Sequence, residues 1–109
     1  MNNIEQSALD KICELKGVTP EMVLSKSRQR AKVEARQLFM YWLKENTTHT
    51  LTTIGRMLGY RDHTTVIHSI SHIKDIIHTD DSIKEIWVHL RENCHTSFTS
   101  LKYRPCQKN

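Results

Sequence analysis

The chain has 109 residues, which is enough for one domain with a single hydrophobic core. Its 16 lysines and arginines outnumber its 12 aspartates and glutamates, so the net charge is +4 and an anionic partner is favoured. Three cysteines without a CxxC spacing argue against a disulfide framework and a thiolate zinc site. Because no secretory leader and no run of about 18 apolar residues is present, we expect a soluble cytoplasmic protein without a membrane partner.

The N-terminal part of the chain predicts two helices. The first has apolar residues at helical spacing and ends at Gly17. These residues should form its buried stripe: Ile4, Ala8, Ile12 and Leu15. Thr19 and Pro20 are typical of a helix start, and they predict a short turn of helix from Glu21 to Leu24.

A longer helix is predicted from about residue 31 to residue 44 and should be the main core element. Its wide apolar face comprises Ala35, Leu38, Phe39, Trp42 and Leu43. No strand pattern, internal repeat or low-complexity segment competes with helices anywhere in the chain.

Two further helices with a glycine between them predict a helix-turn-helix. The first lies within residues 50–59 and ends at Gly59, and the second begins after Asp62, which is a good N-cap. The buried residues of the pair should be Leu51, Ile54 and Leu58, then Val66, Ile70, Ile73 and Ile77, with Ile67 and Ile76 widening the second stripe.

The last predicted helix is capped by Asp80 or Asp81. Its inward residues should be Ile83, Ile86, Trp87 and Leu90. We therefore expect an all-α, compact bundle of five to six helices over residues 1–92, followed by a poorly ordered tail over residues 93–109.

The second helix of the predicted helix-turn-helix, which begins after Asp62, has a polar side opposite its apolar stripe. This side is mostly uncharged. It carries His63, Thr64, Thr65, His68, Ser69 and His72. Short donors, acceptors and methyl groups suit the floor of the major groove of DNA, whereas a solvated helix face more often has lysine and glutamate pairs. A capped and solvated helix start remains the alternative, because aspartate and threonine are ordinary residues there.

A basic segment, SKSRQRAK at residues 25–32, has a cation at every second position. In an extended loop this alternation would place Lys26, Arg28 and Arg30 on one side, where phosphates are the natural target. An arginine from such a loop could also enter a minor groove. The alternative is a solvated charge run without a partner.

Four motifs together carry a family resemblance: LSKSRQR at 24–30, ARQ at 35–37, MYWLKENT at 40–47 and LTTIGRMLGYRDHTTVIHS at 51–69. In this order and spacing they resemble the C-terminal DNA-binding domain of the bacterial replication initiator DnaA, and RDHTTVIH is the most specific part. The likeness covers most of the first 90 residues. It implies a Trp-repressor-like helix-turn-helix bundle that binds double-stranded DNA at DnaA boxes.

The resemblance also implies roles for single residues. Arg28 would enter the minor groove, with Lys26 and Arg30 making backbone or groove contacts nearby. The residues implied to contact bases and phosphates in the major groove are Arg61, Asp62, His63, Thr64 and Thr65. Leu51 and Thr52 would lie over the DNA backbone and thymine methyls. His68 would lie further along the DNA-facing side, with Ser69 beside it.

The chain departs from the family's pattern at several positions. Thr52 stands where the family often has proline, and Tyr60 replaces the second of two glycines in the turn. Ser71 and His72 occupy positions that are commonly basic, which implies weaker phosphate contacts. The 109 residues hold no GxxxxGK[ST] loop, so we expect no ATPase module and no bound nucleotide.

We therefore expect a non-enzymatic protein that binds double-stranded DNA sequence-specifically, as a monomer on a single site related to the DnaA box. It would act as a replication-related regulator or accessory, with replication proteins as candidate further partners and no cofactor. The rival metal hypothesis rests on His68 and His72, which are four residues apart but lack a third ligand at a diagnostic spacing. A second alternative is a protein-interaction module of the same fold with no specific DNA target.

Overall fold

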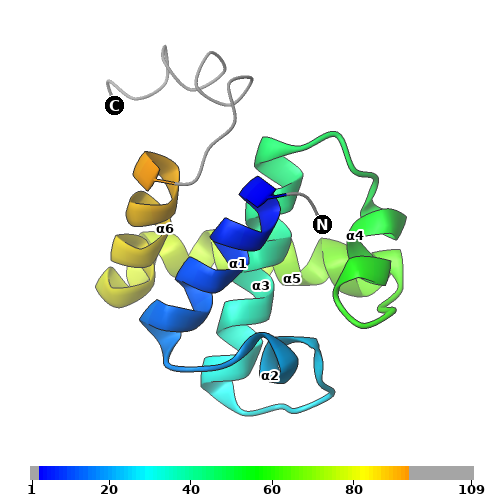
Figure 1. The fold of residues 1–109 in the computed structure, drawn as a ribbon, viewed down its shortest axis with the longest axis horizontal. Helices are drawn as coiled ribbons and strands as arrows, with labels where there is room; N and C mark the ends of the chain where they lie inside the picture. Colours follow the sequence, from blue (N-terminus) through cyan, green and yellow to red (C-terminus); the bar gives the residue numbers. More distant parts are fainter. Residues whose placement is uncertain (1–2, 94–109) are drawn as a thin grey trace.

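The central element of the fold is a 17-residue helix, α3, which is covered by helices on two sides. In this computed structural model, which describes residues 3–93, there are six helices and no strand. They are α1 (Asn3–Lys16), α2 (Pro20–Leu24), α3 (Arg30–Asn46), α4 (Leu51–Met57), α5 (His63–Thr79) and α6 (Asp81–Asn93). Figure 1 shows α1 crossing in front of α3 and α5 passing behind it, with α4 and α6 at opposite ends of α5. The predicted all-α bundle is confirmed, and α4 and α5 form the helix-turn-helix.

Helix starts are fixed by the side chains expected to cap them. The Thr19 hydroxyl accepts from the Met22 N–H at 3.2 Å, and the Asp80 carboxylate accepts from the Ser82 N–H at 3.0 Å. Both contacts satisfy N–H groups that have no partner within the helix. Gly17, which follows α1, has φ of +72°, the left-handed conformation that suits a glycine helix stop.

The core is formed mainly by α3, as predicted. Every residue of its expected apolar face is buried: Ala35, Leu38, Phe39, Trp42 and Leu43. The ring of Trp42 is stacked near that of Phe39, with 6.3 Å between their centroids. Around α3, the core takes in Ala8 and Ile12 from α1 and the inward residues expected for α6: Ile83, Ile86, Trp87 and Leu90.

The buried face of α1 differs from the predicted one. In α1, Ile4 and Leu15 are exposed, and Leu9 and Cys13 are buried instead. The spacing of apolar residues in α1 fits either face, and the packing of α1 against both α3 and α6 selects the second one. Burial raises the pKa of the Cys13 thiol to about 11, so this cysteine is a neutral core residue.

The N-terminal end of α1 is tied to the loop that precedes the helix-turn-helix. Glu5 is buried, and its carboxylate lies 2.8 Å from Nε2 of His49, just before the Thr50 cap of α4. This contact helps to position α4 on the bundle.

None of the helices over residues 3–93 is apolar over a length that could cross a lipid bilayer. Residues 94–109, which contain nearly all of the predicted tail, lie outside the described part.

Candidate nucleic-acid interface

The start of α5 presents an exposed carboxylate that also caps the helix. The Asp62 Oδ1 atom accepts from the Thr65 N–H at 2.8 Å, and this hydrogen bond holds the pKa of Asp62 below its ordinary value. The side chain remains exposed, so the ionised carboxylate retains free acceptor positions. Capping and contact with a base are therefore compatible roles for Asp62.

Most of the predicted reading face of α5 is open to solvent. His63, Thr64, Thr65 and His68 are all exposed. The prediction that Ser69 shares this face is wrong, because only 9% of Ser69 is exposed and its side chain points into the bundle. Conversely Ile67, expected to be buried, is 45% exposed. The buried stripe runs through residues 66, 69, 73 and 77, because α3 and α4 both pack on that side of α5.

The turn between α4 and α5, residues 58–62, is tightly closed. The Arg61 N–H donates to the Gly55 carbonyl at 2.8 Å, and a Cβ atom on Gly55 would overlap the carbonyl oxygen of Arg61. Gly59 has φ of +89°, and a Cβ atom there would lie 2.7 Å from the carbonyl oxygen of Leu24. Both glycines are thus required by close backbone approach, and the turn packs against the end of α2.

The basic loop, residues 25–29, is held on this turn by two arginines. Arg36 is buried and donates to the carbonyls of Val23 at 2.8 Å, Ser25 at 2.9 Å and Ser27 at 3.1 Å. From the turn, Arg61 also donates to the Ser25 carbonyl, at 2.5 Å. Burial lowers the pKa of both guanidinium groups, but an arginine remains charged at neutral pH. The loop backbone is therefore fixed beside the start of α5.

These hydrogen bonds divide the cations in and around the basic loop into two groups. Lys26 and Arg28 are exposed on the loop, as predicted, whereas Arg36 and half-buried Arg61 are engaged with internal carbonyls. In the sequence, Arg36 stands only within the ARQ motif at 35–37, and no role is predicted for it. Nothing in a local pattern distinguishes an arginine that bonds distant carbonyls from one on the surface, so this role was missed.

Arg30 is exposed but carries internal ion pairs. Its Nε atom lies 3.0 Å from Oε2 of Glu34, and a guanidinium nitrogen lies 4.0 Å from Oδ2 of Asp80. Glu34 is buried and also receives Lys16 at 2.6 Å. The pKa of Glu34 stays below its ordinary value, since hydrogen bonds from Lys16 and Arg30 outweigh the opposing effect of burial. A phosphate contact by Arg30 would have to compete with Glu34.

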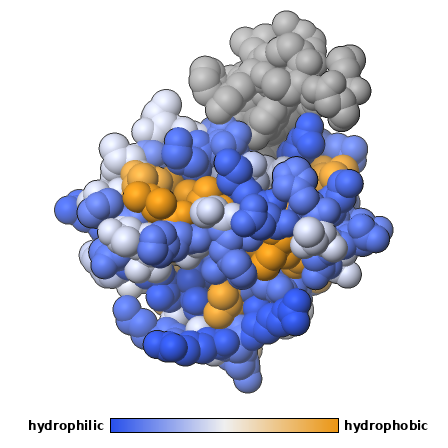
Figure 2. Space-filling view, turned by 180° about the vertical axis from the view of Figure 1, so that it is seen from behind, coloured by the Kyte–Doolittle hydropathy of each residue, from blue (hydrophilic) through white to orange (hydrophobic). Residues whose placement is uncertain are grey.

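Two hollows lie beside α5, one next to the basic segment and the other at the turn between α4 and α5. One, of about 390 Å³, lies between α3 and α5, where Gln37 Oε1 is 3.1 Å from Nδ1 of His72 and Arg28 and Arg30 form part of the lining. The other, of about 250 Å³, lies at the turn, and its lining is Thr52, Arg56, Tyr60, Arg61, Asp62 and His63. Leu51 is half-buried at the start of α4, next to exposed Thr52. Figure 2, viewed from the side on which α5 lies, shows a mainly hydrophilic surface with small separate hydrophobic patches.

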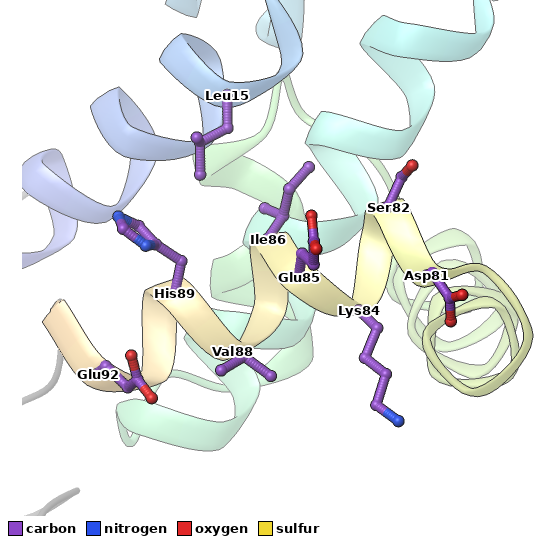
Figure 3. A pocket seen from close by; sticks show the side chains of 9 residues that line it. All are labelled: Leu15, Asp81, Ser82, Lys84, Glu85, Ile86, Val88, His89 and Glu92. Atoms are coloured by element: carbon purple, nitrogen blue, oxygen red, sulfur yellow. The ribbon is translucent and has the colours of Figure 1, made fainter.

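A larger hollow, the α1–α6 groove, lies elsewhere and has different chemistry. It measures about 790 Å³ and is lined by Leu15, Asp81, Ser82, Lys84, Glu85, Ile86, Val88, His89 and Glu92. Figure 3 shows Leu15 of α1 and Ile86 of α6 pointing toward each other across it, with Glu85 beside Ile86. Three carboxylates against one lysine would repel a phosphate backbone, so size alone does not identify the nucleic-acid surface.

Among the residues that the structure describes, no three histidine, cysteine, aspartate or glutamate side chains are grouped as metal ligands.

Comparison with known proteins identifies the family of the chain. Residues 6–73 match the family described as "Bacterial dnaA protein helix-turn-helix". The chain is 34% identical over 84 residues to the chromosomal replication initiator protein DnaA of Thermus thermophilus, covering 77% of this chain and 19% of that protein. It is 36% identical over 87 residues to DnaA of Chloroflexus aggregans (80% and 18%), and 43% identical over 68 residues to DnaA of Streptococcus mutans (62% and 15%). The chain spans less than a fifth of the length of these relatives. It belongs to the family of bacterial DnaA helix-turn-helix domains.

Proposed function

We propose that this domain binds double-stranded DNA sequence-specifically, at sites related to the DnaA box. Family membership supports DNA binding in general. The observation that carries the finer proposal is the hydrogen bond from Arg61 to the Ser25 carbonyl. It joins the start of α5 to the basic loop across 36 residues of sequence, so that one duplex can meet both elements at once.

The start of α5 has the chemistry needed to read base edges. The Asp62 carboxylate can accept from a cytosine amino group, and the methyl groups of Thr64 and Thr65 can contact thymine. His63, at the first helical position, can donate to a purine acceptor. With His68 one turn further along, these side chains form an exposed face on a 17-residue helix, and a major groove can admit such a helix.

The basic loop supplies the contacts that hold the duplex in register. Lys26 and Arg28 are exposed on a backbone that Arg36 and Arg61 immobilise, so few loop conformations are lost on binding. We infer that Arg28 enters the minor groove and that Lys26 meets a phosphate. Thr52 and Leu51, at the start of α4, would lie over the adjacent backbone. Ser71 and His72, where cations are common in the family, would leave fewer phosphate contacts along α5.

We further propose that the domain acts in replication control as a regulator or accessory that occupies DnaA-box-like sites. The relatives it matches are chromosomal replication initiators. These 109 residues hold no nucleotide-binding loop, so box occupancy by this domain would not depend on nucleotide. The domain would engage a single box as a monomer.

The test is a mobility-shift titration with a duplex that contains a DnaA box and a duplex of the same composition in scrambled order, each at two salt concentrations. The expected result is a clear preference for the box duplex at both concentrations, with affinity for both duplexes falling as salt rises. Equal affinity for the two duplexes would contradict specific reading. No binding to either at low salt would favour a protein-interaction module, for which the α1–α6 groove is the available hollow.

A further inference from the structure

Tyr60 combines an unusual backbone conformation with a side chain that has no polar or ring contact in the described part of the chain. Its φ is +63°, and among residues 3–93 it alone occupies positive φ without being a glycine. For an L-residue other than glycine this conformation is strained. The side chain is 82% exposed, and within the described part of the chain it makes no hydrogen bond, ion pair or ring contact. The exposed ring and hydroxyl of Tyr60 are therefore available to a partner outside the domain.

The position of Tyr60 is dictated by the turn. The Arg61 N–H is bonded to the Gly55 carbonyl, and Gly59 is pressed against the Leu24 carbonyl, so the chain between them can only bend outward. Tyr60 lies at that outward point. The tight turn therefore projects an aromatic side chain from a backbone that is fixed on both sides.

The surroundings of Tyr60 belong to the proposed reading surface. Tyr60 lines the 250 Å³ hollow at the turn together with Asp62 and His63 at the start of α5 and Thr52 on α4. Arg56, in the last turn of α4, lies across the same hollow and is exposed, with no ion pair to another described residue. Tyr60 and Arg56 therefore lie on the surface that α4 and the start of α5 share.

We propose that Tyr60 is a DNA contact: its hydroxyl donates a hydrogen bond to a phosphate next to the bases read by α5, and its ring packs on the adjoining sugar. The proposal rests on the proposed function. A phenol suits this place because it is rigid and amphipathic, and because, unlike a further carboxylate, it does not repel phosphate beside Asp62. Arg56 binds the same strand through charge. Tyr60 thus adds affinity at a position where the family pattern has glycine.

The test measures affinity for the box duplex and thermal stability on three variants. Tyr60→Phe removes only the hydroxyl and should weaken binding about fivefold with an unchanged melting temperature. Tyr60→Gly removes the ring as well and should weaken binding about tenfold or more, while its melting temperature equals or exceeds that of the wild type, since glycine adopts positive φ without strain. Tyr41→Phe is the matched control. Tyr41 is half-buried and stacked on Trp87 at 4.3 Å, away from the turn, so loss of its hydroxyl should leave binding unchanged.

Salt dependence separates this contact from a charge contact. Arg56→Ala should lower the slope of log affinity against log salt by about one, whereas Tyr60→Phe should leave the slope unchanged. Equal or tighter binding by Tyr60→Gly would overturn the inference. So would a Tyr60→Gly variant whose melting temperature falls along with its affinity, because Tyr60 would then be structural. If wild-type protein does not distinguish the box from the scrambled duplex, the proposed function fails instead, which is a separate result.

Discussion

The two sides of the molecule use charge in opposite ways. On the helix-turn-helix side, cations of the basic loop are exposed, and the exposed residues at the start of α5 are short, polar and mostly neutral. On the other side, Leu15 and Ile86 face each other across the α1–α6 groove, whose lining includes the carboxylates of Asp81, Glu85 and Glu92. The charge of the larger hollow therefore disfavours DNA, whereas the exposed cations beside α5 favour it. For a nucleic-acid partner, the sign and exposure of the charges are more informative than the volume of a pocket.

Within the helix-turn-helix side, the arginines divide further into internal and external roles. Arg36 and Arg61 bond backbone carbonyls of the α2–α3 segment, while Arg28 projects from the loop that they hold. Substitutions in the first group should change folding, and substitutions in the second should change only binding. The following predictions test this division from the largest expected effect to the smallest.

Arg36→Ala should have the largest effect. It leaves the carbonyls of Val23, Ser25 and Ser27 without their charged donor, and we expect a loss of about 2–4 kcal/mol in the free energy of unfolding. Binding to every duplex should fall as well, because the basic loop loses its anchor. Urea unfolding measures the first effect, with exposed Arg56→Ala as the matched control that should unfold like the wild type. Equal stability of the two variants would show that the loop does not depend on Arg36.

Arg28→Ala should lower affinity for the box duplex by about 1–3 kcal/mol without changing the melting temperature. Its side chain is exposed and the described contacts include none that it makes within the bundle. Titration of the box duplex and a thermal melt of the same sample give the two values. A lowered melting temperature would place Arg28 among the internal arginines and break the division.

Asp62→Asn separates capping from reading. Asparagine caps helices as well as aspartate does, so stability at neutral pH should change little, whereas base preference should relax by about 1–3 kcal/mol because an acceptor-only group is lost. Competition between box duplexes that differ in one base pair measures the preference. An unchanged preference would show that Asp62 is only a cap. Thr65→Ala should relax preference in the same way.

Acid unfolding gives an independent reading of the Asp62 cap. The folded-state pKa of Asp62 is lowered by the Thr65 hydrogen bond, so its contribution to stability is present above the unfolded pKa of about 3.9 and is lost as pH falls through the folded pKa. Wild-type protein should therefore lose more stability than Asp62→Asn as the pH is lowered from about 5 to about 3. Parallel curves for the two proteins would contradict this.

Lys26→Ala should have a smaller and less selective effect. It should weaken binding to box and scrambled duplexes alike and reduce the salt slope by about one. Glu85→Gln, in the α1–α6 groove, is the matched charge change on the opposite side and should leave DNA affinity within about twofold. If Lys26→Ala relaxed base preference as Asp62→Asn does, the separation of positioning from reading would be wrong.

Local features made much of this fold predictable. The Thr19, Asp62 and Asp80 caps and the Gly17 stop mark helix ends through contacts within a few residues, and the structure has them all. The wide face of α3 was equally clear from spacing. The rotations of α1 and α5 were not, because an apolar stripe can widen toward either flank and only neighbouring helices decide. Thus Ser69 was expected outside and Ile67 inside, and both expectations were wrong.

The candidate site was predictable in its parts and not in its assembly. The alternating cations of the loop and the polar face of α5 were visible in sequence, and the resemblance connected them. The bonds that bring them together join Arg61 to Ser25 and Arg36 to Val23, and such long-range pairs leave no periodic signal in one sequence. The strain at Tyr60 was also hidden, because a turn tyrosine does not reveal its φ.

The most direct test of the central claim is to map the amide chemical shifts of the domain as the box duplex is added. The account predicts large changes at two separate segments, residues 26–30 and 60–68, saturating at one duplex per chain, while amides of α6 along the α1–α6 groove stay in place. The same changes should be smaller and less localised with the scrambled duplex. Changes centred on α6, or changes at α5 without any at the basic loop, would contradict a DNA surface built from both elements.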